Sequence, residues 1–350
     1  MKKKIAVTGI IMLICGLMLT GCKSLDYKKA VELEQSESYE EAKAIFAELG
    51  DYKDSADHLK ECEDRLSYAE GVELQDKEQY EEAAKIFGGL GEFLDSKDRY
   101  AFCSDMNDAI SQFLSAKEAL EKKNAEFDAV LKEVGEAAYS EAKALDDTLR
   151  PELETAISDA KSLKVSVPSM PGKAEEIREE AEKMNSVDYS ESIAAVSSAR
   201  DSLEYSMKQY SLVDEPEEAY VIRCLKTVPG VLEIAAATED NDPNGNLGKA
   251  GAYYAAIYFT HENVDQEEVS RKGPTVIEKG TDGGGQIEVY HTAEDAEKRN
   301  NYLGGYDGTV LASGSHMVIG TVVIRTSDEL KASQQRELQE AIVAALTKVE

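Results

Sequence analysis

The sequence predicts a multidomain fold: an α-helical repeat and a helical-bundle or coiled-coil stalk, followed by a small α+β domain with a mainly antiparallel sheet. Three patterns predict it. A repeat with a period of 41 residues occupies residues 22–104, and helical apolar spacing continues through residues 105–215. From residue 216 to residue 350, glycines and β-branched runs replace the acidic helical pattern. Because such a change of pattern separates domains, residues 216–350 form the expected C-terminal domain.

Residues 1–21 have the anatomy of a signal peptide. Three lysines at positions 2–4 precede a mostly apolar run over residues 5–19, and polar chain follows Cys22. A membrane-spanning helix needs about 20 predominantly apolar residues, and this run is shorter. The pattern therefore favours a cleaved signal peptide over the alternative, an uncleaved signal anchor.

The end of this segment, Leu19-Thr20-Gly21-Cys22, resembles the lipobox of bacterial lipoproteins, here of the Gram-positive type. The resemblance implies that the Cys22 thiol receives a diacylglyceryl group and that the chain is cut just before Cys22. Two acyl chains hold a protein stably on a membrane, whereas one does so only marginally. We therefore expect a lipid-anchored protein on the extracytoplasmic face of the cell membrane.

The chain is strongly acidic. It has 39 Lys and Arg residues against 69 Asp and Glu residues, a formal charge of −30. The first 21 residues carry three lysines and no acid, so the chain beyond them carries −33. Such a body repels nucleic acid and anionic headgroups, which excludes nucleic acid as a partner. Solubility of exposed helices is the favoured explanation, and attraction of a cationic partner is the alternative.

Two segments align without gaps at the offset of 41 residues. In the first, residues 39–49 place their apolar side chains on one helical face, Gly50 suits a helix C-terminus, and Asp54 suits the N-cap of the next helix. The repeated residues are Tyr27, Leu33, Tyr39, Ala42, Ile45, Phe46, Leu49, Gly50, Asp54, Ser55 and Cys62, which recur as Tyr68, Leu74, Tyr80, Ala83, Ile86, Phe87, Leu90, Gly91, Asp95, Ser96 and Cys103. A period of this size is typical of stacked helical repeats.

The pattern Y-x-x-A-x-x-L followed by E-A-x-x-x-F-x-x-L-G resembles tetratricopeptide repeats, with a period longer than their usual length of about 34 residues. The resemblance implies binding of a protein or peptide in a concave groove. A spacer that only positions the distal domains is an equally weighted alternative, since two units make a small groove.

Residues 105–215 are expected to form the stalk. Phe113, Leu120, Phe127 and Val134 recur every seven residues, which predicts a long helix in a loose bundle or antiparallel coiled coil. Pro151 is expected at the first position of a new helix. Residues 165–172 contain two prolines and are expected to be an extended linker, and helices follow at 174–184 and 189–210. The region resembles helical stalk modules of Gram-positive surface proteins.

The C-terminal domain is expected to contain strands at residues 231–238, 253–260, 286–291 and 317–325. Alternation of apolar and polar residues along these strands predicts one buried and one exposed sheet face. The expected helices lie at residues 219–228, 293–303 and 333–346.

Three motifs in this domain support a resemblance. They are the loop of residues 238–248, compared with the pattern D-P-N-x-L-G, the strand G-G-Q-I-E-V-Y beginning at Gly284, compared with G-G-x-I-E-V-Y, and the helix E-D-A-E-K-R beginning at Glu294, compared with E-D-A-x-x-R. Together they resemble an uncharacterised C-terminal domain of Gram-positive surface proteins and lipoproteins. The resemblance implies an architecture and a location, and no chemistry.

The segment Asp240-x-Asp242-x-Asn244-Gly245 matches the opening of a calcium loop, in which oxygen ligands alternate before a glycine turn. Position twelve of such a loop requires glutamate, and Gly251 stands there. A turn fixed by Pro243 and by Asn244-Gly245 is the favoured interpretation, with a weak calcium site as the alternative.

Catalytic motifs are absent from the sequence. His58, His261, His291 and His316 are scattered, and there is no G-x-S-x-G, H-E-x-x-H or P-loop motif. We therefore expect a non-enzymatic lipoprotein without a cofactor, which presents its C-terminal domain to a protein or cell-envelope partner. A hydrolase or small-ligand-binding C-terminal domain is one alternative, and a purely structural spacer is another. A deep pocket in which a histidine meets a carboxylate would favour the hydrolase.

Overall fold

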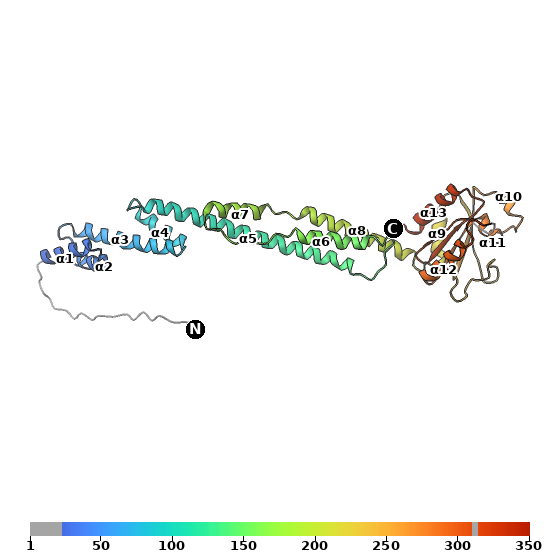
Figure 1. The fold of residues 1–350 in the computed structure, drawn as a ribbon, viewed down its shortest axis with the longest axis horizontal. Coiled ribbons are helices and arrows are strands. Elements are labelled where there is room, and N and C mark those ends of the chain that lie inside the picture. The colour runs from blue at the N-terminus through green and yellow to red at the C-terminus, as the bar shows by residue number, and fades with distance from the viewer. Residues whose placement is uncertain (1–22, 310–313) are drawn as a thin grey trace. The chain divides into compact units, whose positions relative to one another are not determined.

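The computed structural model describes residues 23–309 and 314–350. The predicted signal peptide and the lipobox residues Leu19, Thr20, Gly21 and Cys22 lie outside these residues. The predicted fold class is confirmed, because helices dominate the chain and a five-stranded antiparallel sheet follows near the C-terminus (Figure 1). Within the described ranges, no helix is both long and apolar enough to cross a membrane.

The backbone forms two compact units that interleave in sequence. The first comprises the described residues up to Glu121 together with Ser166–Val187. The second comprises Lys122–Val165 and Asp188–Glu350. The extended residues predicted as a linker, 165–172, lie where the chain passes from the second unit back to the first.

The first unit begins with the two repeats. Their helices are α1 (Lys23–Gln35), α2 (Tyr39–Leu49), α3 (Ser55–Asp76), α4 (Tyr80–Leu90) and the start of α5 (Ser96–Ala138). Phe46 and Cys62 are fully buried in the first repeat, as are Phe87 and Cys103 in the second. The turns repeat as well, because Gly50 and Gly91 have φ angles of 59° and 60°. The 41-residue period is therefore a period of the backbone as well as of the sequence.

A polar cluster closes each repeat. The Tyr27 hydroxyl donates to Asp54 Oδ1 at 2.6 Å. His58 lies on the other side of that pair, with its Nδ1 atom 2.8 Å from Glu34 Oε2 and its ring stacked on Phe46. Asp54 occupies the predicted N-cap position of α3, but its carboxylate accepts no hydrogen bond from the helix terminus and instead accepts the Tyr27 hydroxyl.

The second repeat keeps this cluster and changes its cation. Tyr68 donates to Asp95, and Arg99 replaces the histidine, with its Nε atom 3.0 Å from Asp95 Oδ1. Arg99 also donates to Gln75, which occupies the position of Glu34. The first cluster thus uses an imidazole, whereas the second uses a guanidinium with a permanent charge.

The rest of the first unit packs α7 (Ala174–Ser186) against the N-terminal part of α5. Phe113 and Leu120, two members of the predicted heptad stripe, are buried there with Ile177 and Met184. Arg178 of α7 pairs with Asp105 of α5 at 2.6 Å. The heptad stripe therefore serves as a core seam between helices.

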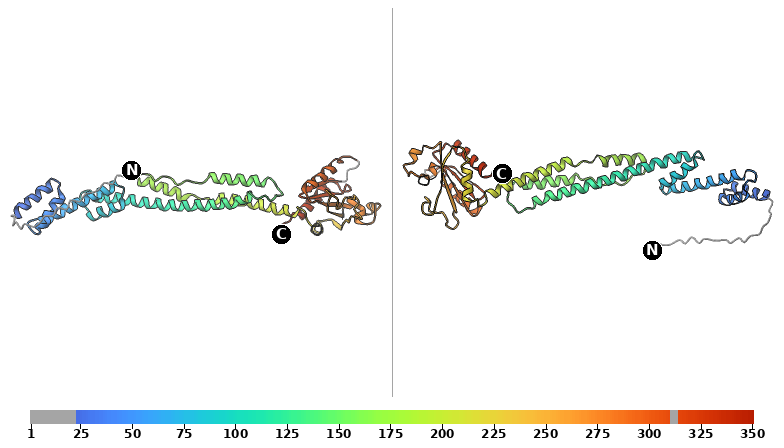
Figure 2. Two further views of the ribbon diagram at one scale, coloured as in Figure 1. Left: turned by 90° about the horizontal axis from the view of Figure 1, so that it is seen from below. Right: turned by 180° about the vertical axis from the view of Figure 1, so that it is seen from behind.

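In the second unit, α6 (Leu149–Ser162) and α8 (Ser190–Leu212) lie side by side (Figures 1 and 2). Phe127 of α5 stacks on Tyr189, just before α8, with ring centroids 4.2 Å apart. The prediction for Pro151 is wrong by two positions, since α6 begins at Leu149. Proline is tolerated there because the first N–H groups of a helix have no intrahelical partner.

The C-terminal sheet has the strand order β1-β2-β3-β5-β4, and every neighbouring pair is antiparallel. The predicted strand at 317–325 is in fact a hairpin. Gly320, with a φ angle of 59°, makes its turn and lies against the Val213 carbonyl oxygen, where a Cβ atom would come within 2.4 Å. The strands are β1 (Val231–Ala236), β2 (Ala255–His261), β3 (Gly284–Val289), β4 (His316–Ile319) and β5 (Val322–Thr326).

Both faces of this sheet are covered, which corrects the prediction of one exposed face. Every residue of β2, β3 and β5 is buried. The helices α9 (Glu218–Leu225) and α13 (Ala332–Leu346) cover one face with an aliphatic core. The helix α12 (Ala293–Gly304) and the short α11 (Val276–Lys279) cover the other (Figure 1). The short α10 (Gln266–Val269) and the 3₁₀ turn Gly280–Gly283 complete the domain.

The core of the domain extends beyond its expected start at residue 216. Val213, which directly follows α8, is fully buried in the same core as α9 and α13. Its carbonyl oxygen accepts the backbone N–H of Thr321 at 2.9 Å. Residues before 216 therefore belong to the packing of the domain.

Replacing His58 by arginine should stabilise the first repeat at pH 8. Arginine is always charged and offers a fork of N–H donors, so it can pair with the Glu34 carboxylate as Arg99 pairs with Asp95 in the second repeat. We expect a gain of up to about 1 kcal/mol in the free energy of opening of the α1 and α2 amides, measured by hydrogen exchange.

The reciprocal variant Arg99→His is the matched control, and it should weaken the second repeat at the same pH. An unchanged or lower protection of α1 and α2 in His58→Arg would contradict the assigned role of the cation.

Candidate functional site in the C-terminal domain

The acidic loop forms around one carboxylate. Asp242 Oδ2 accepts the backbone N–H groups of Asn246 at 2.7 Å and Leu247 at 3.0 Å. The Tyr253 hydroxyl donates to the same oxygen at 2.7 Å. Burial raises the pKa of Asp242, but the hydrogen bonds from Tyr253 and the backbone outweigh it, so the net pKa is lowered. The ionised Asp242 side chain therefore holds the turn together through these hydrogen bonds.

The three residues of the possible calcium site have different surroundings. Asp240 and Asn244 are exposed, whereas Asp242 is buried. The Asn244 amide donates to the Tyr258 hydroxyl at 3.4 Å. In the part of the chain that the structure describes, no group of three His, Cys, Asp or Glu side chains could hold a metal ion. The hydrogen bonds of Asp242 to backbone N–H groups of its own loop agree with the interpretation of this segment as a turn.

The second feature is a buried ion cluster on β3. Glu288 is completely buried, and both of its oxygens accept from Arg299 of α12, each at 2.9 Å. Arg325 of β5 donates to Glu288 at 3.2 Å and to Gln286 at 2.8 Å. The Tyr290 hydroxyl donates to Glu288 at 2.8 Å, and burial raises the pKa of Tyr290, so that this hydroxyl stays protonated.

The three sequence motifs of this domain meet in one polar layer between the sheet and α12. Glu288 and Tyr290 come from the strand motif, and Arg299 ends the helix motif. The loop motif joins through Tyr253, which binds Asp242 and packs edge-on against Tyr290. Buried charges require such pairing because desolvation is costly. These motif residues therefore hold the domain together.

The histidines do not share a site. His261 is buried, its Nδ1 atom accepts the backbone N–H of Asn263, and burial lowers its pKa. His291 is 67% exposed and contacts Glu215 at 2.9 Å. His316 has Nδ1 at 2.7 Å from Asn300 and Nε2 at 3.3 Å from Asp307.

A candidate nucleophile, Ser315, lies next to His316. Both residues line a shallow hollow of about 360 Å³ together with Asp307. The Ser315 hydroxyl, however, donates to Gln339 at 3.3 Å, and both nitrogens of His316 face other residues. Since nucleophilic catalysis needs a base within hydrogen-bond reach of the nucleophile, this geometry differs from that of a serine hydrolase.

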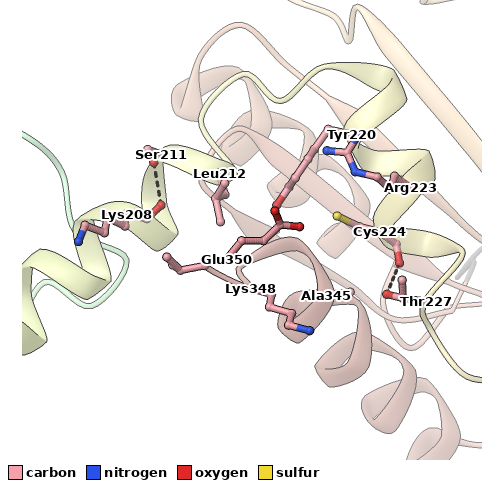
Figure 3. Close-up of a pocket in the computed structure, with 11 residues that line it drawn as sticks. Lys208, Ser211, Leu212, Tyr220, Arg223, Cys224, Thr227, Ala345, Lys348 and Glu350 are labelled. Atoms are coloured by element: carbon pink, nitrogen blue, oxygen red, sulfur yellow. Dashed lines mark hydrogen bonds between the residues drawn. The ribbon is translucent and has the colours of Figure 1, made fainter.

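A cavity of about 670 Å³ lies on the second unit (Figure 3). Its walls come from the end of α8, from α9 and from the end of α13 with the residues that follow. The volume falls within the range of about 300–1,000 Å³ that small-molecule pockets occupy. We call it the α8–α9–α13 cavity.

Its lining combines three cations and the Glu350 carboxylate with apolar and neutral groups. Lys208, Arg223 and Lys348 each come from a different wall. Burial raises the pKa of Tyr220 to about 12 and also raises the pKa of the Cys224 thiol, so both stay protonated near neutral pH. The Tyr220 hydroxyl donates to the Leu346 carbonyl at 2.7 Å, which fixes its ring as part of the wall.

In comparisons with known proteins, no family model, curated protein or solved structure matches the chain. The α8–α9–α13 cavity had no signal in the sequence, because its three cations are single residues on three distant segments. The ion cluster had one, namely a glutamate between the apolar residues Ile287 and Val289 of a strand. Alternation assigned that glutamate to an exposed face.

Replacing Glu288 by glutamine should destabilise the domain strongly. The change leaves the buried Arg325 and the partly buried Arg299 without their carboxylate, and breaking a buried pair in this way costs about 3 to 5 kcal/mol. Hydrogen exchange of the β3 amides would measure the loss as a lower free energy of opening.

The exposed Glu297→Gln on α12 is the control, and it should leave β3 protection unchanged. Equal protection in both variants would contradict the view that the ion cluster holds the domain.

Proposed function

We propose that the protein is a lipid-anchored, extracytoplasmic lipoprotein that binds a protein or cell-envelope partner through its C-terminal domain without catalysing a reaction. The observation that carries the location is Leu19-Thr20-Gly21-Cys22 after a basic and then apolar segment. In this proposal Cys22 carries the diacylglyceryl group.

The contacts of the C-terminal domain support the non-enzymatic part of the proposal. Its motif residues Glu288, Tyr290 and Arg299 are used to pack α12 on the sheet. Its histidines lie in separate places with separate partners. Catalytic groups usually converge in one cleft with perturbed pKa values, so this dispersal favours binding over catalysis.

The helical segments support a role in holding that domain away from the anchor. They occupy the sequence between Cys22 and residue 213, and Val213 joins α8 to the core of the domain. The repeats add a second surface of the type that binds peptides in related architectures. A domain built onto the last helix is suited to presentation to a partner.

The anchor is tested by Cys22→Ser. We expect the variant to leave the membrane fraction, because the residue that would carry the lipid is lost. Cys15→Ser, within the apolar run, is the matched control and should fractionate like the wild type. Retention of Cys22→Ser on the membrane at the wild-type level would refute the lipid anchor.

Binding is tested by site-specific photo-cross-linking on intact cells with the full chain. We expect a cross-linker placed at Leu232 or Tyr302, both 57% exposed on the C-terminal domain, to give a discrete adduct. Tyr139, 83% exposed and outside the domain, is the control position and should give none. Adducts at Tyr139 alone would refute presentation through the domain.

A further inference from the structure

Helix α1 begins directly after the residue that would carry the lipid. Its first residue, Lys23, follows Cys22 in the sequence, so no linker residue separates the proposed anchor from the first helix. A linker gives a domain reach in proportion to its length, and consecutive Cα atoms are only about 3.8 Å apart. Once Cys22 is lipidated, the end of the first repeat at which α1 starts is therefore held at the membrane surface.

The charged residues of α1 are unevenly distributed along the helix. Residues 23–29 contain three lysines, all exposed, and one aspartate, whereas residues 30–35 contain two glutamates and no cation. The chain as a whole carries a formal charge of −30. The lysines of α1 are thus gathered at the end next to Cys22, in a chain that is otherwise acidic.

The turn between α2 and α3 adds another lysine and an aromatic ring to the same end. Lys53 Nζ lies 4.2 Å from the centroid of the Tyr27 ring of α1 and 5.5 Å from that of Tyr52. Lys23 Nζ lies 6.0 Å from the Tyr52 centroid. Lysines from two separate segments therefore meet at the Tyr52 ring, beside the start of α1. Lysine and tyrosine combine an apolar body with a polar tip, which suits the boundary between lipid and water.

The first turn of α1 also exposes a large apolar side chain. Leu25 is 71% exposed. It lies three residues after Cys22, within the first turn of the helix. An apolar group beside lysines is the composition of helices that lie in the membrane interface. A lipid surface at this end would cover Leu25 without any further folding of the chain.

The opposite end of the pair formed by α1 and α2 is strongly acidic. The two helices lie side by side (Figure 1). Early α1 meets late α2, since the Tyr27 and Phe46 rings are 6.1 Å apart, so the helices are antiparallel and residues 30–42 form the far end. That end contains five glutamates and no lysine or arginine.

The near end mixes both signs of charge. Its acids are Asp26, Glu48, Asp51, Asp54 and Asp57, which stand among the lysines. The far end has no cation to offset its glutamates, so anionic headgroups repel the far end more strongly than the near end. The charge pattern and the position of Cys22 therefore favour the same orientation, with the start of α1 toward the membrane.

We propose that the start of α1 and the α2–α3 turn form a membrane-contacting surface that seats the first repeat on anionic phospholipid. Leu25 contacts the boundary between headgroups and acyl chains, and Tyr52 lies at the level of the headgroups. The lipid phosphates are contacted by Lys23, Lys28, Lys29 and Lys53. This inference rests on the proposed lipid anchor, and it adds a protein surface that orients the repeat on the membrane.

Fluorescence quenching by brominated lipid tests the surface. The chain contains no tryptophan, so one introduced tryptophan reports its own surroundings. The lipidated full chain of Leu25→Trp is reconstituted in nanodiscs of phosphatidylcholine and phosphatidylglycerol, with and without bromine on the acyl chains. We expect bromine to reduce the fluorescence of Leu25→Trp by about half, because the side chain reaches the acyl boundary.

Two exposed leucines of the same unit provide the controls. Leu94 is 52% exposed and occupies in the second repeat the position of Lys53 in the first, and Leu114 of α5 is 54% exposed. Leu94→Trp and Leu114→Trp should keep their fluorescence in brominated nanodiscs. An unquenched Leu25→Trp, or equal quenching of all three variants, would overturn the proposal.

The role of the lysines is tested in the Leu25→Trp background. Changing Lys28, Lys29 and Lys53 to glutamine should reduce the quenching at least about twofold, because the attraction to anionic headgroups is lost. The matched control removes the same charge from the second repeat with Lys77→Gln, Lys85→Gln and Lys97→Gln, and it should be quenched like its parent. Equal losses in the two triple variants would contradict the assigned role of the lysines.

Mass spectrometry of each purified protein separates this test from that of the anchor, because it measures the diacylglyceryl group on Cys22 directly. A chain that carries the lipid while Leu25→Trp stays unquenched overturns the membrane-contacting surface and leaves the anchor standing. A chain that lacks the lipid refutes the anchor, and the membrane-contacting surface is refuted with it.

Discussion

The burial of the Glu288 carboxylate between the sheet and α12 is the constraint on which the C-terminal domain depends. A buried charge requires pairing, and guanidinium groups from α12 and from β5 supply it. The cluster thereby joins α12 to one face of the sheet. A separate aliphatic core joins α9, α13 and Val213 to the opposite face.

The sequence was informative wherever structure is local. Helix ends at Gly50 and Gly91, the 41-residue period and the heptad positions of Phe113 and Leu120 follow from propensity and spacing, and the structure contains them. The sequence was less informative where contacts join residues that are distant along the chain. The Asp54 side chain, at the predicted N-cap, bonds to Tyr27 of an earlier helix, and the unpredicted turn at Gly320 packs against Val213, more than 100 residues away.

The same distinction holds for the candidate sites. The acidic loop was visible because its residues are contiguous, and its turn is built by Asp242 through contacts with the next few residues. The ion cluster could be predicted in part. Glu288, Tyr290 and Arg299 belong to sequence motifs, but their meeting in one cluster depends on tertiary contacts. The α8–α9–α13 cavity could not be predicted, because its lining residues lie on three distant segments and come together only in the folded domain.

The polar clusters of the repeats have an evolutionary consequence. Each cluster closes within one 41-residue unit, from Tyr27 to His58 and from Tyr68 to Arg99, and the two share their backbone turns while differing in the cation. This is the pattern expected of tandem duplication followed by divergence, here at the cation and at the Glu34 and Gln75 position. Because each unit carries its own closing contacts, a gene that copies or deletes such a unit lengthens or shortens the chain in whole steps. The length of the chain can therefore change in evolution by whole repeats, while the sequence of the C-terminal domain stays the same.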